Sequence, residues 1–454
     1  MIRLTPPQCV QNVSKFICKP TKSTIFIYLF ILNLLSNLVY LKYNNEAITI
    51  IGIITISTFI SYIESAIYTS IKIICLRKLY ISIIILLHNI LLIIEYFLLL
   101  KFHLIISQEL IDIIADTNKA ESINFLETYL NFSTISLYII LIFIVNFVFI
   151  LISKLLKNTK YQGVSILLVI IGMTFVTYCI YGFARYHNGQ GIPQMSSISR
   201  TGYAIYLTKQ KINENKLLIE TCNKVKATQN IKIKPSIVII IGESYSVYHS
   251  SLYGYNKPTN PLLKHEEKKG NLFLFNNAVT IYPATTATMY AVFSLDSLGV
   301  NFTDKPLFPI CFKKTGYKVK MYDNQYFVNQ GLSFMCDNDV SKTLFDYRNI
   351  KEYKYDEDLV KSITVNKNPT LYIIHLKGQH YIYKTRFPIQ FTKFKAKDYS
   401  FKYTEEQRQI MADYDNATLY NDNVVNSIFD KFKNKYCCIF YFSDHGEEVY
   451  ELRD

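Results

Sequence analysis

The first 182 residues alternate between long apolar stretches and short connections that carry charge. A bilayer core of about 30 Å requires roughly 20 apolar residues per helix. Stretches of that kind lie at residues 23–41, 47–67, 79–100, 135–153 and 164–182. The first is too long and lies too far along the chain for a signal peptide, and no small-residue cleavage site follows it. The pattern therefore predicts a transmembrane domain of five helices over residues 1–182.

After residue 182 the apolar runs become short. Residues 183–230 combine a segment containing Gly, Pro and Ser with an amphipathic charged stretch, which is typical of a linker and a bridging segment. Beyond them, β-branched or aromatic runs alternate with helical patterns, at residues 235–241, 317–322, 370–375 and 436–442. Strands that are apolar on both faces favour a sheet covered by helices on each side. Residues 231–454 are thus predicted to form one α/β domain with a mostly parallel central sheet.

Composition and charge support a membrane protein with a fixed orientation. Half of the residues are hydrophobic and only 19% are charged, which argues against a disordered chain and an ordinary soluble one. Lys and Arg number ten in the N-terminal tail and the second and fourth connections, against three in the first and third. This bias places the N-terminus in the cytoplasm and the residues after 182 on the other side. The net charge of +14 is explained by cytoplasmic loops that lie near anionic lipid. No basic run is interleaved with aromatic residues, so we expect no nucleic-acid partner.

Ionisable residues also occur within the predicted spans. Glu64 and Glu95 lie within a turn or two of their span ends, and His88 lies deeper. Such residues are usually functional or paired. Acidic side chains near a span end could reach the interface, and we assign none of these three residues a role.

Side chains that bind metals follow three of the predicted strands. They are Glu243 after the first run, His375 and His380 at the end of the third, and Asp444 and His445 after the fourth. In open parallel sheets ligands bind beyond the carboxyl ends of the strands, so we expect these side chains to share one crevice. Taken singly, each residue fits a turn or a helix start. Together they predict a site for zinc, one or two ions, with manganese as the alternative metal.

A candidate nucleophile precedes a helical pattern at residues 289–295. Pro283 favours a helix start, where unpaired backbone N–H groups and the helix dipole attract an anion. The hydroxyl of Thr285, or of Thr286 as the alternative, could lose its proton to a bound metal and attack phosphorus. Without a neighbouring metal site, either threonine would simply cap the helix.

The order of these motifs resembles one family, the membrane phosphoethanolamine transferases of Gram-negative bacteria, which belong to the alkaline phosphatase and sulfatase superfamily. The resemblance covers nearly the whole chain. It includes five spans and motifs at residues 242–261, 315–325, 355–357, 375–388, 414–422 and 443–447. The implied fold is a five-helix transmembrane bundle followed by an alkaline phosphatase-like α/β domain. The implied location is the bacterial inner membrane, with several crossings, a cytoplasmic N-terminus and a periplasmic catalytic domain.

The resemblance implies a two-step transfer. In this family zinc is held by residues that match Glu243, Thr285, Asp444 and His445. Thr285 would attack the phosphorus of phosphatidylethanolamine, and diacylglycerol would leave. The phosphoethanolamine group would then pass to a hydroxyl or phosphate of an envelope glycolipid or glycan, such as lipopolysaccharide core, lipid A or a periplasmic glucan. The expected partners are therefore this donor, such an acceptor and membrane lipids.

Four further residues acquire substrate-binding roles through the resemblance. His380 would bind the phosphoryl oxygens or a second zinc ion, and His375 lies beside it at a strand end. Thr117 and Glu121 match a segment that contacts the ethanolamine ammonium. For Thr117 and Glu121 a helix N-cap and a solvated helix face are equally good interpretations.

The surroundings of the threonine distinguish branches of the family. The spacing to residues 293–295 favours Thr285 over Thr286 and fits branches with a Pro-x-Thr entry into the helix. The lipid A branch has a Cys-Gly-Thr entry, which this chain lacks. The sequence is thus closer to the branches that modify core oligosaccharide or glucan.

Three alternative functions share parts of this pattern. A glycerophosphate transferase of the same superfamily would use the same metal set, but its Gly-Lys-Thr-Ser entry is missing. A phosphodiesterase would use the same residues with water as the acceptor. An inactive membrane scaffold is the third, because the chain stops at Asp454, nine residues after His445, whereas family members continue through further strands and a later His. We expect the domain at residues 231–454 to be truncated at its C-terminus.

The cysteines outside the predicted membrane domain lead to two structural expectations. Cys311 and Cys336 are the pair expected to form a disulfide in an oxidising compartment, although spacing alone cannot show a pairing. Cys437 and Cys438 are adjacent on a predicted buried strand, so we expect both in the core.

Overall fold

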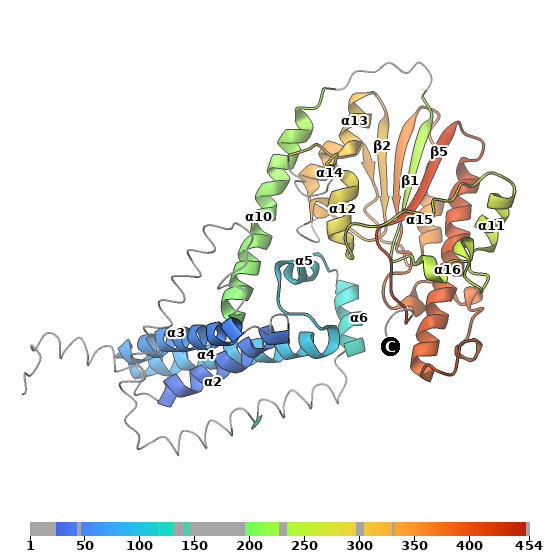
Figure 1. The fold of residues 1–454 in the computed structure, drawn as a ribbon. Helices are drawn as coiled ribbons and strands as arrows, with labels where there is room; N and C mark the ends of the chain where they lie inside the picture. Colours follow the sequence, from blue (N-terminus) through green and yellow to red (C-terminus); the bar gives the residue numbers. More distant parts are fainter. Residues whose placement is uncertain are drawn as a thin grey trace, which may run out of the picture. The chain divides into compact units, whose positions relative to one another are not determined.

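A computed structural model describes residues 24–42, 47–117, 119–129, 196–226, 234–296, 304–328 and 333–450, with residue 331 and a few single positions between 136 and 147. The chain divides into two compact units. One comprises residues 1–111 and 125–209, and the other comprises residues 112–124 and 210–454. Figure 1 shows the elements of both units in chain order. The predicted domain boundaries at residues 182 and 230 lie outside the described ranges and stay predictions.

Three apolar helices form the described part of the membrane domain. They are α2 (Thr24–Leu38), which continues into the 3₁₀ turn η2 (Val39–Lys42), α3 (Ala47–Ser70) and α4 (Ile74–Phe102). Each is long and apolar enough to cross a membrane, over Thr24–Leu41, Thr49–Ser70 and Ile74–Phe102. The first three predicted spans are thus confirmed as apolar helices. The spans predicted at 135–153 and 164–182 lie outside the continuously described residues, so the five-helix bundle stays a prediction.

Ionisable side chains in this unit are buried in pairs. Glu64 Oε1 lies 2.9 Å from His88 Nε2, and the Asn33 amide donates to Glu64 Oε2 at 3.2 Å. Glu95 is fully buried and pairs with Arg200. Both carboxylates are therefore paired within the protein. Desolvating a charge costs less when a partner compensates it, and both carboxylates have one within the protein.

Three helices follow the apolar ones along the chain. They are α5 (Gln108–Asp116), α6 (Lys119–Tyr129) and α10 (Ser197–Asn223). Helix α10 falls within the predicted bridging segment. Near its end, Leu218 and Cys222 pack into a core of the second unit.

The second unit contains a five-stranded sheet in the order β3-β2-β4-β1-β5 (Figure 1). Its strands are β1 (Ser236–Gly242), β2 (Lys318–Asp323), β3 (Tyr347–Arg348), β4 (Thr370–His375) and β5 (Cys437–Ser443). All four neighbouring pairs are parallel. The four predicted strands and the parallel sheet are confirmed. The sequence analysis missed β3, because two residues are too short for a recognisable apolar run.

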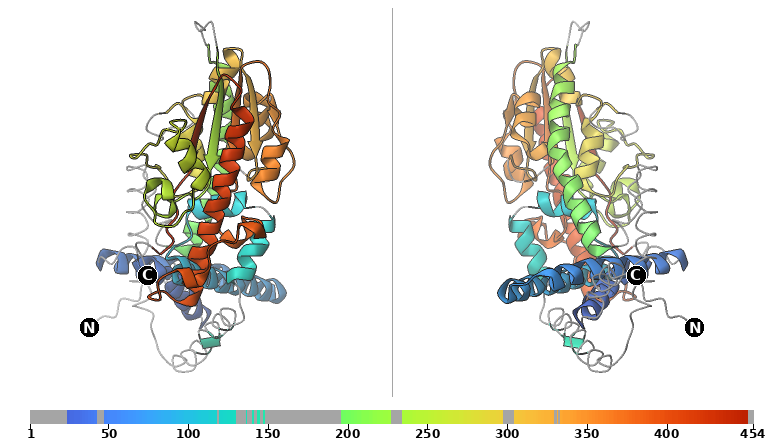
Figure 2. Two further views of the ribbon diagram at one scale, coloured as in Figure 1. Left: turned by 90° about the vertical axis from the view of Figure 1, so that its right-hand side faces the viewer. Right: turned by 90° about the vertical axis from the view of Figure 1, so that its left-hand side faces the viewer.

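Helices cover both faces of this sheet. One core contains residues of α11 (Pro261–Lys268), α15 (Asp356–Ser362) and α16 (Glu405–Phe432). The other contains residues of α12 (Thr285–Phe293), α13 (Phe308–Lys314) and α14 (Asn338–Leu344). Figure 2 shows α16 lying along the length of one face. The central strand β4 is buried along its whole length, as its doubly apolar run predicts, whereas the outer strand β5 alternates in exposure.

Short 3₁₀ turns connect these elements. They are η4 (Val247–His249), η5 (Ser251–Tyr253), η6 (Phe334–Cys336), η7 (Tyr383–Thr385), η8 (Ile389–Phe391) and η9 (Ala396–Asp398). The first two immediately follow β1 and lead into α11.

Both cysteine expectations are wrong. Cys311 and Cys336 are free thiols, on α13 and η6 respectively. Burial in the apolar core accounts for Cys336 without a disulfide. Cys438 is exposed and Cys437 only half-buried, because β5 is the last strand in the described sheet order and its residues alternate in exposure.

Candidate active site

The register of the sheet brings two acidic residues together. In the pairing of β1 with β5, Gly242 lies opposite Ser443. Each strand is followed by a carboxylate, Glu243 after β1 and Asp444 after β5. Because the strands are parallel, both carboxylates emerge at the same edge of the sheet. A backbone hydrogen bond of 3.0 Å from Asp444 N to Gly242 O continues the ladder to this point.

A third residue completes a cluster with metal-binding side chains. One ligand atom each from Glu243, Asp444 and His445 lies within 4.8 Å of the others. Both carboxylates are buried and the imidazole is half-buried. The predicted metal residues therefore do converge. Two carboxylate oxygens and one imidazole nitrogen form a donor set that zinc accepts.

Glu243 accepts hydrogen bonds on both oxygens. Ser244 Oγ donates to its Oε1 at 2.8 Å, and Gln325 Nε2 donates to its Oε2 at 2.9 Å. Burial alone would raise the pKa of Glu243, but the His445 hydrogen bond and the charges of His380 and His445 lower it well below its usual value. The residue is therefore an ionised acceptor at neutral pH.

Asp444 has one satisfied oxygen and one unsatisfied oxygen. Its Oδ1 accepts the backbone N–H groups of Ser244 at 3.1 Å and His445 at 2.6 Å. Its buried Oδ2 makes no hydrogen bond within the described part of the chain, although His445 Nε2 lies 3.4 Å away. Burial and the charge of Glu243 raise the pKa of Asp444 to about 7. A buried oxygen without a hydrogen bond is costly unless a proton or a cation binds it.

The backbone orients His445 for metal binding. Its Nδ1 lies 2.7 Å from Gly446 O and donates to it, which leaves Nε2 facing the carboxylates. Burial alone would lower the pKa of His445, but the hydrogen bond with Glu243 and the charges of Asp444 and Glu243 raise it to about 10. Without a metal, a proton on His445 thus compensates the two acidic groups.

The two candidate nucleophiles have different surroundings. Thr285 Oγ1 donates to Glu243 Oε2 at 3.0 Å and lies 3.4 Å from His445 Nε2. Thr286 Oγ1 instead lies 2.8 Å from the Tyr326 hydroxyl. Neither threonine caps the helix, because Ala284 is the N-cap residue of α12 and makes no side-chain capping bond. The geometry favours Thr285 as the residue at the cluster.

Two unusual backbone positions bring the loops close together. Ser244 has φ of 54°, in the left-handed region that most residues avoid, and this turn aims its N–H at Asp444. Gly378 has φ of 47°, and a Cβ there would lie 2.8 Å from the backbone oxygen of Glu243. Only glycine lets the loop after β4 approach β1 this closely.

His375 is a buried residue that contacts the cluster indirectly. Its ring is fully buried, with Nδ1 3.0 Å from Asp323 Oδ1 and Nε2 3.0 Å from Gln325 Nε2. The same Gln325 amide donates to Glu243 and, at 2.7 Å, to Leu376 O. His375 therefore contacts the cluster through Gln325, and both its ring nitrogens already have protein partners.

The sequence analysis assigned no role to Gln325 or Asp323. Both belong to the motif at residues 315–325, and Asp323 ends β2, so the strand-end argument could have found them. The Gln325 amide orients the candidate metal ligand Glu243 but is not itself a metal ligand, so its residue type does not indicate a metal site in the sequence.

We expect the Gln325→Ala substitution to lower zinc affinity by about 10- to 100-fold, the usual cost of losing an outer hydrogen bond to a metal ligand. The reason is that Glu243 Oε2 would lose its 2.9 Å bond. Competition with a chromogenic chelator measures the affinity. Gln409→Ala is the matched control, because this exposed glutamine bonds only Asp413 among the contacts described for it. Equal affinities for the two variants would contradict the assignment.

The other predicted substrate residues lie outside the three-residue cluster. His380 is half-buried, and its Nδ1 lies 3.4 Å from Arg386 Nη2. The Thr117 hydroxyl donates to Ile113 O at 2.6 Å, at the end of α5. Glu121 lies on α6, and its side chain is outside the described residues. The roles of these three residues stay predictions.

Comparisons with known proteins were made for the whole chain. Residues 235–454 match the Sulfatase family. Phosphoethanolamine transferase EptC of Escherichia coli strain K12 is 32% identical over 278 residues, which cover 55% of this chain and 47% of that protein. Phosphoethanolamine transferase EptA of Helicobacter pylori strain 26695 is 31% identical over 229 residues, which cover 47% of this chain and 42% of that protein. This chain spans about half the length of the curated relatives it matches.

One similar solved structure extends over both parts of the chain. It is the integral membrane protein lipooligosaccharide phosphoethanolamine transferase A of Neisseria meningitidis. The match has a TM-score of 0.54 and 16% identity, and it covers 96% of this chain and 83% of that one. At this identity it supports the fold alone, an N-terminal membrane part followed by an α/β domain.

Proposed function

We propose that this chain, whose residues 235–454 match the Sulfatase family, is a membrane-anchored phosphoethanolamine transferase that works through a covalent intermediate on Thr285. The donor is phosphatidylethanolamine, and the acceptor is an envelope glycolipid or glycan on the periplasmic side of the bacterial inner membrane. The observation that carries the proposal is the position of Thr285 Oγ1, 3.0 Å from Glu243 and 3.4 Å from His445. The names of the curated relatives supply the group that is transferred.

The cluster fits a zinc ion on its own chemistry. Glu243, Asp444 and His445 supply oxygen, oxygen and nitrogen, and the buried Asp444 Oδ2 lacks a hydrogen bond among the described residues. A catalytic zinc typically has three protein ligands and an open position for the reacting group. Thr285 lies beside two of the three residues that would hold the ion, Glu243 and His445. Bound there, zinc would supply a Lewis acid that lowers the pKa of a neighbouring hydroxyl and neutralises phosphoryl charge.

The first half-reaction forms a phosphothreonine. The Thr285 oxygen bonds to phosphorus while the bond from phosphorus to the diacylglycerol oxygen breaks. The threonine proton moves first toward Glu243, which already accepts the Thr285 hydroxyl, and ends on the diacylglycerol oxygen. Thr285 is the first residue of α12, and the first N–H groups of a helix have no intrahelical partner. These groups and the helix dipole would hold the phosphoryl oxygens.

The second half-reaction reverses the chemistry at the same atoms. An acceptor oxygen bonds to phosphorus, the bond from phosphorus to Thr285 breaks, and the acceptor proton returns to the threonine. Glu243 again accepts this hydrogen bond. His375 and Gln325 keep the carboxylate in place throughout, because their partners are buried protein groups.

The adduct on Thr285 tests the reaction directly. Purified full-length protein is incubated with phosphatidylethanolamine and zinc, digested and analysed by mass spectrometry. We expect a phosphoethanolamine group on the peptide that contains Thr285. In a parallel incubation with phosphatidylglycerol, a glycerophosphate group on that peptide would instead support the glycerophosphate transferase. Release of free phosphoethanolamine from phosphatidylethanolamine without an acceptor would support the phosphodiesterase. Absence of any adduct and of any released product would contradict the proposal and favour the scaffold.

We expect zinc binding to release more protons at low pH than at high pH. Without metal, His445 has a pKa of about 10 and Asp444 a pKa of about 7. Zinc requires both ligands deprotonated, so binding displaces about one proton at pH 8 and about two at pH 6. Affinity therefore rises with pH, and it rises more steeply below pH 7. Calorimetry in two buffers with different ionisation enthalpies counts the protons. The same count at both pH values would contradict this charge assignment.

A further inference from the structure

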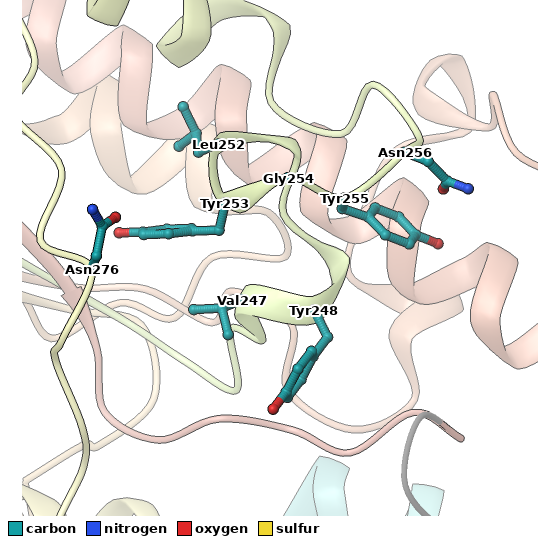
Figure 3. A pocket seen from close by; sticks show the side chains of 8 residues that line it. All are labelled: Val247, Tyr248, Leu252, Tyr253, Gly254, Tyr255, Asn256 and Asn276. Carbon is teal, nitrogen blue, oxygen red and sulfur yellow. The ribbon is translucent and has the colours of Figure 1, made fainter.

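An open pocket lies beside the turns that follow β1. Its volume is about 770 Å³, within the usual range for small-molecule sites. Tyr248 lies on η4, Tyr253 ends η5, and Tyr255 and Asn256 follow the Gly254 turn (Figure 3). Figure 3 shows the ring of Tyr253 extending toward Asn276, which comes from the separate segment after α11. The proposed chemistry uses none of these residues.

The pocket is lined by residues within 247–256 and by Asn276, and the chain close to each of these segments forms a hydrogen bond with Asp444. The Ser244 N–H donates to Asp444 Oδ1 at 3.1 Å, and Thr280 Oγ1 donates to Asp444 O at 2.7 Å. Tyr248 follows Ser244 by four residues, and Asn276 precedes Thr280 by four. An extended chain spans at most about 3.6 Å per residue, so Tyr248 and Asn276 each lie no more than about 14 Å from the residue that bonds Asp444. These two pocket residues therefore lie near the candidate active site.

Some pocket side chains are rigid and others are free to bind. The Tyr255 hydroxyl donates to Asp415 Oδ2 at 2.8 Å, and the Tyr253 hydroxyl donates to Phe275 O at 3.4 Å. By contrast, the Tyr248 hydroxyl and the amides of Asn256 and Asn276 make no hydrogen bond with any residue that the structure describes. Fixed aromatic rings thus lie next to polar groups that can donate to and accept from a ligand.

The chemistry of the lining limits the ligand. None of the eight lining side chains is charged, so the pocket does not suit a phosphate group. A diacylglycerol chain would desolvate two amides and a phenol without compensating hydrogen bonds, which is unfavourable. A pyranose ring has an apolar C–H face and a rim of hydroxyls. It can pack its face on tyrosine and satisfy the asparagine amides at the same time.

We infer that this pocket binds a neutral pyranose of the acceptor, so that the acceptor is recognised through its sugar and not through a phosphate. The assignment of this sugar to the acceptor rests on the proposed function, but sugar binding itself does not depend on it. The pocket residues orient the glycan while its reacting oxygen reaches the phosphothreonine.

Sugar binding is tested first, without catalysis. Saturation-transfer NMR is recorded on the full-length protein in detergent with the methyl glycosides of glucose, galactose and N-acetylglucosamine. We expect saturation transfer to at least one glycoside, and its loss in Tyr248→Ala and Asn276→Ala. Tyr436→Ala is the matched control, because Tyr436 is 70% exposed and does not line the pocket. No transfer to any glycoside in the unsubstituted protein, or equal transfer in all variants, would overturn the inference.

The two half-reactions are then measured separately. We expect Tyr248→Ala to raise the KM for a glycolipid acceptor about tenfold, the size expected for losing one aromatic contact. Adduct formation on Thr285 should fall no further than in Tyr436→Ala. Slower adduct formation specific to Tyr248→Ala would show that the pocket holds the donor lipid, and it would overturn the inference. Failure of the unsubstituted protein to form any adduct would contradict the proposed function, while the NMR experiment would still decide on sugar binding.

Discussion

Replacing Thr285 by alanine is expected to reduce phosphoethanolamine transfer by about 10⁴-fold or more, because removing a nucleophile typically costs at least this much. The Thr285 hydroxyl lies 3.0 Å from Glu243 Oε2, and alanine supplies no oxygen at that position. The covalent adduct should disappear with the activity. Mass spectrometry of the protein after incubation with phosphatidylethanolamine measures the adduct, and release of diacylglycerol measures turnover.

The neighbouring threonine provides the matched control. Thr286 is on the same turn of α12, but its hydroxyl contacts Tyr326 at 2.8 Å. We expect Thr286→Ala to retain the adduct and to lose less than about tenfold in rate, and Thr285→Ser to retain a measurable adduct because a hydroxyl remains. A normal adduct on the Thr285→Ala protein would assign the nucleophile to another residue. Loss of the adduct in Thr286→Ala alone would reverse the assignment.

Replacing Asp444 by asparagine should abolish stoichiometric zinc binding with little effect on the fold. Oδ1 accepts two backbone N–H groups, so the asparagine oxygen will occupy that position and the NH₂ group will replace Oδ2. A donor then points at the place where a metal ligand is needed. We expect zinc affinity to fall by more than the roughly 100-fold that outer-residue changes cost, and activity to fall with it.

Thermal unfolding separates this loss from misfolding. A ligand that binds the folded state raises the melting temperature, so zinc should stabilise the unsubstituted protein and leave Asp444→Asn unchanged. Asp430→Asn is the matched control, because Asp430 is an exposed partner of Lys433 on the surface of α16. An Asp444→Asn protein that binds zinc as tightly as this control would remove Asp444 from the site.

The strand-end residues show how much a sequence without its structure can indicate. Glu243 and Asp444 were predicted to converge because parallel strands end at one edge, and the pairing of Gly242 with Ser443 brings them together. His375 illustrates the limit of this argument. It too lies at a strand end, but Asp323 and Gln325 occupy its ring nitrogens. Sequence position indicates the edge of the sheet, whereas the direction of each side chain depends on its neighbours.

The charged residues of the membrane helices show the same limit. The hydropathy pattern correctly located three apolar helices but did not identify the partners of Glu64 and Glu95. Their partners His88 and Arg200 are 24 and 105 residues away along the chain. No local pattern identifies a pairing over such distances. Packing of the helices creates it, since a buried charge needs a compensating partner.

By itself, the sequence determined the apolar helices, the doubly apolar strands, the residue types suited to a metal and the two threonines at the start of α12. These features depend on local composition and on the short-range geometry of helices and strands. Only the tertiary structure decided that Thr285 and not Thr286 contacts Glu243, that Gln325 joins the cluster, and that one buried oxygen of Asp444 has no hydrogen bond from any described residue. Each of these depends on the distance between residues far apart along the chain, which the folded backbone alone sets.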